Sequence, residues 1–233
     1  HEDILYLGDT ARAPYGPRPL SEVRQFALES LDYLVDHDVK ALVIACNSAS
    51  SAVLRDARER YDVPVIEVIL PAARRAAKAT RNGRIGVICT VATASSLSYS
   101  DALAAVPGIE LFTAPCPLFV DYVERGVTGG SELLEVTRGY LEPLKREGVD
   151  TLILGCTHYP LLKTMIGEFM GQRVTLVDPA KTAAHHLERM LSERGLKAAQ
   201  EHEGQAHFYV SDVPDSFVQT ADLFLGEYKG GPV

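Results

Sequence analysis

Two cysteines with the same sequence surroundings are the first feature of this chain that indicates chemistry. Cys46 lies in residues 39–48 and Cys156 in residues 149–158. The two segments align without a gap, from a valine through a charged residue and an apolar run to a small residue, the cysteine and two polar residues. A thiolate is a base and the matching thiol is an acid. A pair on opposite sides of a carbon centre suits racemisation or epimerisation, because one cysteine removes a proton and the other returns one to the opposite face.

The elements that would position these cysteines are duplicated as well. Apolar residues recur every three or four positions in residues 21–37 and again in residues 131–147, which predicts an amphipathic helix before each cysteine segment. Each copy is therefore predicted as a helix, a turn, a buried strand and a cysteine at the carboxyl end of that strand, where open α/β sheets bind ligands. The copies lie 110 positions apart, which favours two related half-domains over a solenoid with its repeats of ~20–50 residues.

Strands and helices alternate along the whole chain, which predicts an α/β fold with mainly parallel sheets flanked by helices. We expect two pseudo-symmetric half-domains with the active site in the cleft between them, the first formed by residues 1–70 and 179–233 and the second by residues 71–178. Helices predicted at residues 51–61 and 159–170 follow the two cysteines. The backbone N–H groups at a helix N-terminus favour a thiolate, so we expect lowered pKa values for both thiols.

Two further segments are candidates for polar contacts with a ligand. Residues 8–19 contain three prolines and two glycines and predict a rigid, non-helical loop, for which a surface turn is the simplest interpretation. Residues 89–96 place small hydroxyl side chains at a strand-to-helix junction, where they can bind an anion or cap the helix. Near the end of the chain, residues 214–225 predict a last helix.

Composition limits the partners and the compartment. A net charge of −8 leaves no basic surface for nucleic acid. The apolar runs are far shorter than the ~20 residues of a membrane span, and no signal peptide is visible. The first residues lead straight into a strand without an initiator methionine, so we expect further residues upstream. Four cysteines without a CxxC pair predict free thiols in a reducing cytoplasm.

Other interpretations of the cysteines stay open at this point. A cysteine at a strand end can be a small buried apolar residue, and Cys46 and Cys156 can form a redox disulfide. Both cysteines with His158 can also bind zinc, although Cys156 and His158 are poorly spaced for chelation and a fourth ligand is not evident. The sequence contains no dinucleotide, P-loop, metalloprotease or kinase motif, so we expect neither a cofactor nor a metal.

Four motifs in chain order resemble those of bacterial glutamate racemases, in the aspartate/glutamate racemase family. Two of them contain the cysteines, one resembles the first substrate loop of the family, and one resembles a further family segment. Their sequences are ACNSAS at 45–50, LGCTHYPLL at 154–162, LYLGDT at 5–10 with APYG at 13–16, and PCPLFV at 115–120 followed by Glu124.

The resemblance implies a cofactor-independent interconversion of L- and D-glutamate that supplies D-glutamate for peptidoglycan. It implies that Cys46 and Cys156 are the acid/base residues and that His158 and Glu124 assist proton transfer. The substrate contacts that it implies are Tyr15, Gly16, Asn47, Ser48, Thr90, Thr93, Thr157 and His158. It also implies a cytoplasmic homodimer without a membrane or direct nucleic-acid partner, in a family of which some members bind DNA gyrase.

The chain departs from the family pattern in several places. The opening strand of the family, with its aspartate-serine-glycine motif, has no counterpart here. Ser48 replaces a threonine, Cys89 replaces a glycine, and Asp121-Tyr122 replaces a proline-leucine pair. Aspartate racemases share the fold, and two cysteines do not reveal the side-chain length of the substrate. A non-catalytic amino-acid-binding regulator is a second alternative, although the presence of both cysteines argues against it.

Overall fold

The computed structural model describes residues 1–212, 217 and 221 of the chain. The strands are β1 (Ile4–Gly8), β2 (Leu42–Ile44), β3 (Val65–Glu67), β4 (Arg84–Cys89), β5 (Glu110–Pro115), β6 (Thr151–Gly155), β7 (Thr175–Val177) and β8 (Ala206–Val210). The α-helices are α1 (Leu20–Val35), α2 (Asn47–Arg60), α3 (Ile69–Ala79), α4 (Val91–Ser95), α5 (Ser98–Leu103), α6 (Leu118–Glu124), α7 (Ser131–Arg146), α8 (Lys163–Met170) and α9 (Pro179–Glu193). Short 3₁₀ helices η1 and η2 span Thr10–Arg12 and Tyr159–Leu162.

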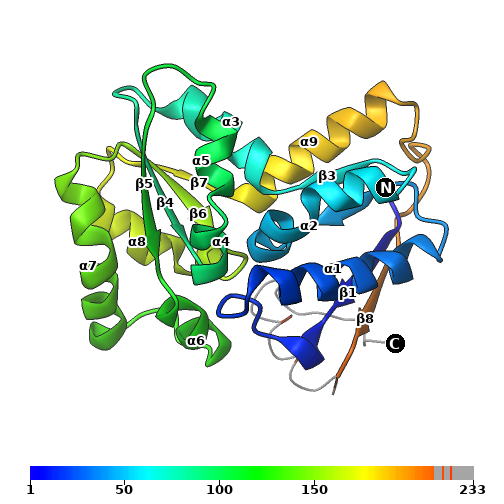
Figure 1. The fold of residues 1–233 in the computed structure, drawn as a ribbon, viewed down its shortest axis with the longest axis horizontal. Coiled ribbons are helices and arrows are strands. Elements are labelled where there is room, and N and C mark those ends of the chain that lie inside the picture. Colours follow the sequence, from blue (N-terminus) through cyan, green and yellow to red (C-terminus); the bar gives the residue numbers. More distant parts are fainter. Residues whose placement is uncertain (213–216, 218–220, 222–233) are drawn as a thin grey trace.

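A four-stranded parallel sheet with the order β5-β4-β6-β7 forms the larger part of the molecule (Figure 1). Its central strands are apolar on both faces, as expected for a parallel sheet covered on both sides. Leu152 and Leu154 of β6 pack with α6, α7 and α8, whereas Ile153 between them packs with α3 and α5. We call this sheet with α4 to α8 the second half.

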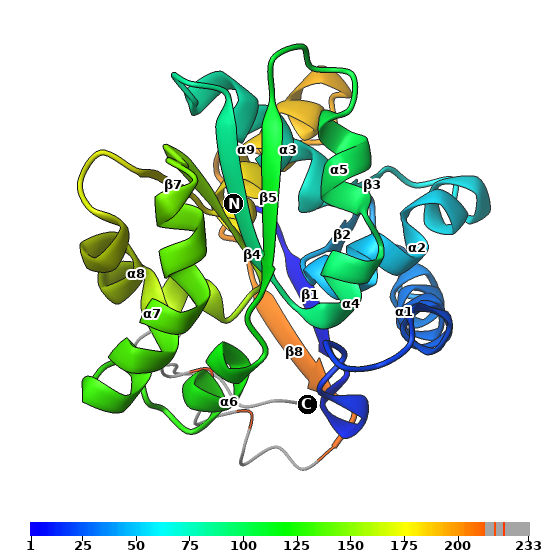
Figure 2. The same cartoon turned by 60° about the vertical axis from the view of Figure 1, so that its left-hand side comes forward.

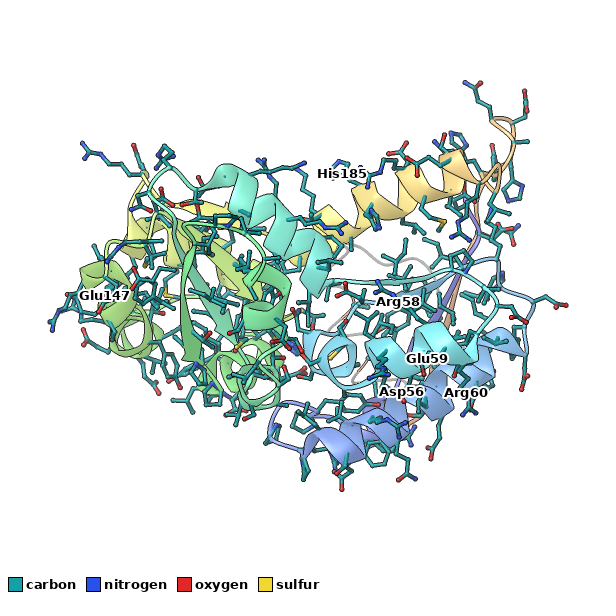
Figure 3. All side chains as sticks on the ribbon, turned by 45° about the horizontal axis from the view of Figure 1, so that its top comes forward. Asp56, Arg58, Glu59, Arg60, Glu147 and His185 are labelled. Carbon is teal, nitrogen blue, oxygen red and sulfur yellow. The ribbon has the colours of Figure 1, made fainter. Side chains whose placement is uncertain are left out.

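The first half consists of α1 and α2 with two two-stranded parallel sheets, β1-β8 and β2-β3. Buried side chains of α1 and α2 pack against Leu42 and Ile44 of β2. On the outer surface Arg24 pairs with Asp56, and Arg60 pairs with Asp32, which joins the two helices at their exposed edges; Figure 3 labels Asp56 and Arg60 on α2. Such exposed pairs each contribute only about 0–1 kcal/mol, so the apolar contacts provide most of the packing energy.

Helices α3 and α9 pack against each other between the two halves (Figures 1 and 2). Glu67, at the end of β3, is 1 % exposed and its carboxylate accepts hydrogen bonds from the backbone N–H groups of Ile69 and Leu70. It thereby satisfies donors at the start of α3 that have no partner within the helix. The buried Glu67 carboxylate thus fixes the connection from β3 to α3, where the chain leaves the first half.

The predicted duplication is confirmed. Helix α1 leads through β2 to Cys46, and helix α7 leads through β6 to Cys156, so each cysteine follows the carboxyl end of a parallel strand. The α/β class with parallel sheets flanked by helices is confirmed as well. The residue boundaries of the two half-domains stay a prediction, and the helix predicted at residues 214–225 lies outside the described residues.

Two local predictions are wrong. Helix α2 begins at Asn47 and not at residue 51, because the N–H group of Ser50 bonds to the Cys46 carbonyl at 2.8 Å and closes a first turn four residues earlier. The helical segment predicted at residues 159–170 is confirmed, with η2 as its first turn and α8 after it, because the N–H groups of Tyr159 and Leu161 bond three residues back. The loop at residues 8–19 is not wholly non-helical, since it contains η1.

Candidate active site

Cys46 is the N-cap residue of α2. Burial raises the pKa of its thiol, the nearby Cys156 raises it further, and hydrogen bonds from Ala49 and Ser48 at the start of the helix oppose that rise. The expected lowering of this pKa is therefore wrong, because the energetic cost of burying a thiolate exceeds the stabilisation from the helix N-terminus. In this geometry Cys46 favours the protonated thiol.

Cys156 directly follows β6 and is 7 % exposed. The residue before it must be small, since a Cβ atom on Gly155 would lie 2.7 Å from the carbonyl oxygen of Ile88 on the neighbouring strand. The missing Cβ lets β6 approach β4 closely at the position where the cysteine leaves the sheet. Because η2 and not an α-helix comes next, the α-helix N-terminus expected at Cys156 is absent.

A histidine and a carboxylate take the place of that helix. His158 Nδ1 lies 3.7 Å from Cys156 Sγ and 3.3 Å from Thr157 Oγ1, and His158 Nε2 lies 2.5 Å from Glu124 Oε1. Burial alone would lower the pKa of His158, but the interactions with Cys156 and Glu124 outweigh it and raise the pKa to about 10. The hydrogen bond to His158 in turn lowers the pKa of Glu124. The structure thus brings together four of the predicted site residues, Cys156, Thr157, His158 and Glu124.

Hydrogen bonds between the two halves join several of the expected substrate contacts. Ser48 Oγ lies 2.8 Å from Thr90 Oγ1, and Thr90 Oγ1 donates a hydrogen bond to Thr93 Oγ1 at 3.1 Å. The Ala92 N–H donates to the carbonyl of Gly16 at 2.9 Å. As the N-cap residue of α4, Thr90 also accepts a hydrogen bond from the Thr93 N–H. The hydroxyl predicted either to bind an anion or to cap the helix therefore does cap it.

The loop that follows β1 contributes to the same region. The hydroxyl of Tyr15 donates to Asp9, which also accepts from Arg12 and Ser211. Burial and Asp9 raise the pKa of Tyr15, and Cys46 is near enough to add to that rise. The surface-turn interpretation of this loop is therefore wrong at two residues: Tyr15 lies near Cys46, and Gly16 packs against Thr90 of the opposite half.

Sequence reasoning assigned no role to Asp9 or Tyr99. Asp9 belongs to the LYLGDT motif of the first substrate loop, and this position could have identified it as a site residue. Tyr99, whose hydroxyl donates to Asn47 Oδ1 at 2.7 Å, comes after the hydroxyl-rich segment 89–96 and no local pattern marks it. Its contact depends on the packing of α5 against the start of α2.

All four cysteines are free. Cys156 lies near enough to interact electrostatically with Cys46, and also with Cys89 and Cys116. Burial raises the pKa of Cys89 to about 12, so this cysteine keeps its proton. Within the described residues no group of three or more histidine, cysteine, aspartate or glutamate side chains is arranged to hold a metal ion. The site thus offers two thiols, one imidazole and several hydroxyl and amide groups.

The known proteins that this chain resembles in sequence and structure are racemases. The family model described as Asp/Glu/hydantoin racemase matches residues 1–187. The chain is 57% identical over 226 residues to the glutamate racemase of a Parafrankia species, covering 97% of this chain and 82% of that protein. The crystal structure of glutamate racemase isoform RacE1 from Bacillus anthracis matches with a TM-score of 0.95 and 37% identity, over 100% of this chain and 87% of that one.

A structure of glutamate racemase from Francisella tularensis, determined in complex with D-glutamate, matches with a TM-score of 0.92 and 34% identity over 100% of this chain and 87% of that one. The family model, the relatives and the parallel α/β fold together define an amino-acid racemase. The chain belongs to the Asp/Glu/hydantoin racemase family. Among the helices of the described residues, none combines the length and the apolar character that a membrane span requires.

Proposed function

We propose that this chain interconverts L- and D-glutamate without a cofactor and that Cys46 and Cys156 are its two acid/base groups. The observation that carries the proposal is the position of the two thiols, which follow equivalent strands and lie near enough to interact. The relatives named glutamate racemase, one of them bound to D-glutamate, support the choice of substrate.

The two thiols have different surroundings. His158, whose pKa is raised to about 10, is an imidazolium at neutral pH and places a positive charge 3.7 Å from Cys156 Sγ. Burial raises the pKa of Cys46, which favours its thiol. We therefore assign Cys156 as the base and Cys46 as the acid of one reaction direction, which is the pairing that a two-base racemisation requires.

The reaction balances with one proton in and one proton out. The Cys156 thiolate takes the α-proton of glutamate, and the electron pair of the broken C–H bond passes to the α-carbon. The Cys46 thiol then gives its proton to the opposite face of that carbon and becomes a thiolate. The reverse sequence converts the other enantiomer. His158 maintains its contact with Cys156, and Glu124 orients the imidazolium.

The substrate carries two carboxylates and one ammonium group, so its site needs several hydrogen-bond donors for the carboxylate oxygens. We assign them to Asn47, Ser48, Thr90, Thr93 and Thr157, with Tyr15 and Gly16 from the first loop. Ser48 and Thr90 are 2 % and 6 % exposed, so water competes little for their hydroxyl groups. The hydroxyl-to-hydroxyl contacts between them are ones that a carboxylate can replace.

The remaining assignments depend on the same proposal. The halves meet at the boundaries 70/71 and 178/179, with the active site in a cleft between them. The enzyme acts in the cytoplasm as a homodimer, and its D-glutamate enters peptidoglycan.

The test is α-proton exchange in D₂O, followed by NMR with L-glutamate, D-glutamate and aspartate as separate substrates. Exchange with both glutamate enantiomers by the wild-type chain is the expected result, and Cys46→Ser and Cys156→Ser should each lose the exchange of a different enantiomer. Exchange with aspartate alone would keep the mechanism and replace the substrate. If the folded protein exchanges none of them, the racemase proposal is wrong and an amino-acid-binding regulator takes its place.

A further inference from the structure

Tyr99 is a buried tyrosine to which the proposed mechanism gives no role. It belongs to α5 in the second half, is 3 % exposed, and its hydroxyl donates to Oδ1 of Asn47 at 2.7 Å. Asn47 is the first residue of α2 in the first half, directly after Cys46, and is also 3 % exposed. The hydrogen bond therefore joins the two halves next to Cys46. Figure 2 shows the two helices that carry its partners, α5 and α2.

The chemistry of this bond fixes the orientation of an amide. Burial raises the pKa of Tyr99 well above its ordinary value, so the hydroxyl keeps its proton and remains a donor. An amide that accepts this proton with Oδ1 presents its NH₂ group in the other direction. Within the described part of the chain, Nδ2 of Asn47 makes no hydrogen bond and is not enclosed either. Its two donors are thus available to an acceptor outside the protein.

The backbone before Tyr99 adopts a conformation that side chains usually avoid. Leu97, between α4 and α5, has φ +58° and ψ +11°, which is the left-handed region. This conformation is unfavourable for a residue with a Cβ atom. Leu97 is 61 % exposed, so the packing of its own side chain does not compensate. The turn does place α5 so that Tyr99 points into the interface between the halves.

We propose that Tyr99 is a positioning residue, which holds the Asn47 amide so that its NH₂ group binds a carboxylate of the substrate. The proposal rests on the proposed function. Without the Tyr99 hydroxyl the amide can rotate by 180° and present its oxygen, which repels a carboxylate. This interaction acts on bound substrate and transition state alike, so its loss raises KM and changes kcat less.

The experiment measures racemisation kinetics with both enantiomers for the wild-type chain, Tyr99→Phe, Asn47→Ala and the double variant. We expect Tyr99→Phe to raise KM about tenfold and to change kcat less than about threefold, which corresponds to one lost hydrogen bond to a charged group. Because Tyr99 acts through Asn47, adding Tyr99→Phe to Asn47→Ala should produce no further rise in KM.

Controls separate positioning from general destabilisation. Tyr61→Phe removes a hydroxyl that bonds to Asp32 at the other end of α2, and it should leave both KM and kcat unchanged. Should Tyr99→Phe not fold, the same change in a Leu97→Gly background relieves the backbone strain and gives the same kinetic readout.

The outcomes are distinct. A wild-type KM in Tyr99→Phe, or fold-changes that multiply in the double variant, would overturn the positioning role while the racemase proposal stands. A wild-type chain that does not racemise glutamate would end the proposed function, and this inference with it, before any Tyr99 variant is compared.

Discussion

Cys46 follows β2 as the N-cap residue of a fourteen-residue helix, whereas Cys156 directly follows β6 and contacts a histidine. The two segments are related in sequence, and both cysteines follow a parallel strand. Around Cys46 the available charge stabilisation comes from backbone N–H groups of α2, and burial outweighs it. Around Cys156 an imidazolium held by Glu124 supplies a full positive charge. The two copies of the duplicated strand-cysteine unit thus surround their thiols with different groups, as the assignment of one acid and one base in the proposed mechanism requires.

The strongest test of this comparison removes one thiol at a time. Cys46→Ser and Cys156→Ser should each reduce racemisation about 10²–10⁴-fold, the range for a positioned acid or base. Each variant should still exchange the α-proton of one enantiomer with retention of configuration, because the remaining cysteine can remove a proton and return a deuteron on its own face. NMR in D₂O on each enantiomer measures both effects. Exchange of the same enantiomer by both variants would contradict the placement of the thiols on opposite faces.

The next test removes the charge that distinguishes Cys156. His158→Asn should lower kcat about 10²-fold, since the thiolate loses its imidazolium. The loss of α-proton exchange should be larger in the Cys46→Ser background, where Cys156 is the remaining thiol, than in the Cys156→Ser background. NMR in D₂O on the two double variants gives the ratio. Equal losses in the two backgrounds would indicate that the histidine acts on both cysteines, and the contrast between the two turns would then disappear.

Glu124→Gln should have a smaller effect on rate and a clearer effect on pH dependence. The Glu124 side chain is 52 % exposed, and exposed ion pairs contribute about 0–1 kcal/mol, so we expect at most about a fivefold fall in kcat. Because Glu124 helps to raise the pKa of His158, its neutralisation should move the alkaline limb of the pH–rate profile to lower pH. An unchanged limb would mean that Cys156 alone holds the histidine protonated.

The sequence was sufficient for features that depend on local pattern. The apolar runs before Cys46 and Cys156 and the amphipathic helices before them predicted both strand ends correctly, because burial repeats with the period of each element. The start of α2 was missed because Asn47, Ser48 and Ser50 are residues typical of a turn, although the same side chains also favour a helix N-terminus.

Features that depend on packing between distant elements could not be predicted in this way. The Ser48–Thr90 and Asn47–Tyr99 hydrogen bonds join residues from opposite halves, and no spacing along the chain encodes them. The direction of the Cys46 pKa shift required the degree of burial, which a helix N-terminus alone does not reveal. The partnership of His158 and Glu124 came from the family resemblance, and its geometry came from the structure.

The smallest expected effect concerns the stability that the Cys156 turn gains from its histidine. The pKa of His158 is about 10 in the folded chain, above its ordinary value of 6.5. Its protonation therefore stabilises the fold fully below pH 6.5, and this contribution is lost as the pH rises through about 10. Urea unfolding of the wild-type chain and of His158→Asn should show a stability difference at pH 6 that shrinks towards pH 10. His185→Asn, on the surface of α9 (Figure 3), controls for removal of an exposed histidine. If the difference between wild type and His158→Asn were the same at both pH values, the imidazolium would not be the group that stabilises this turn, and the contrast with Cys46 would depend on packing instead of charge.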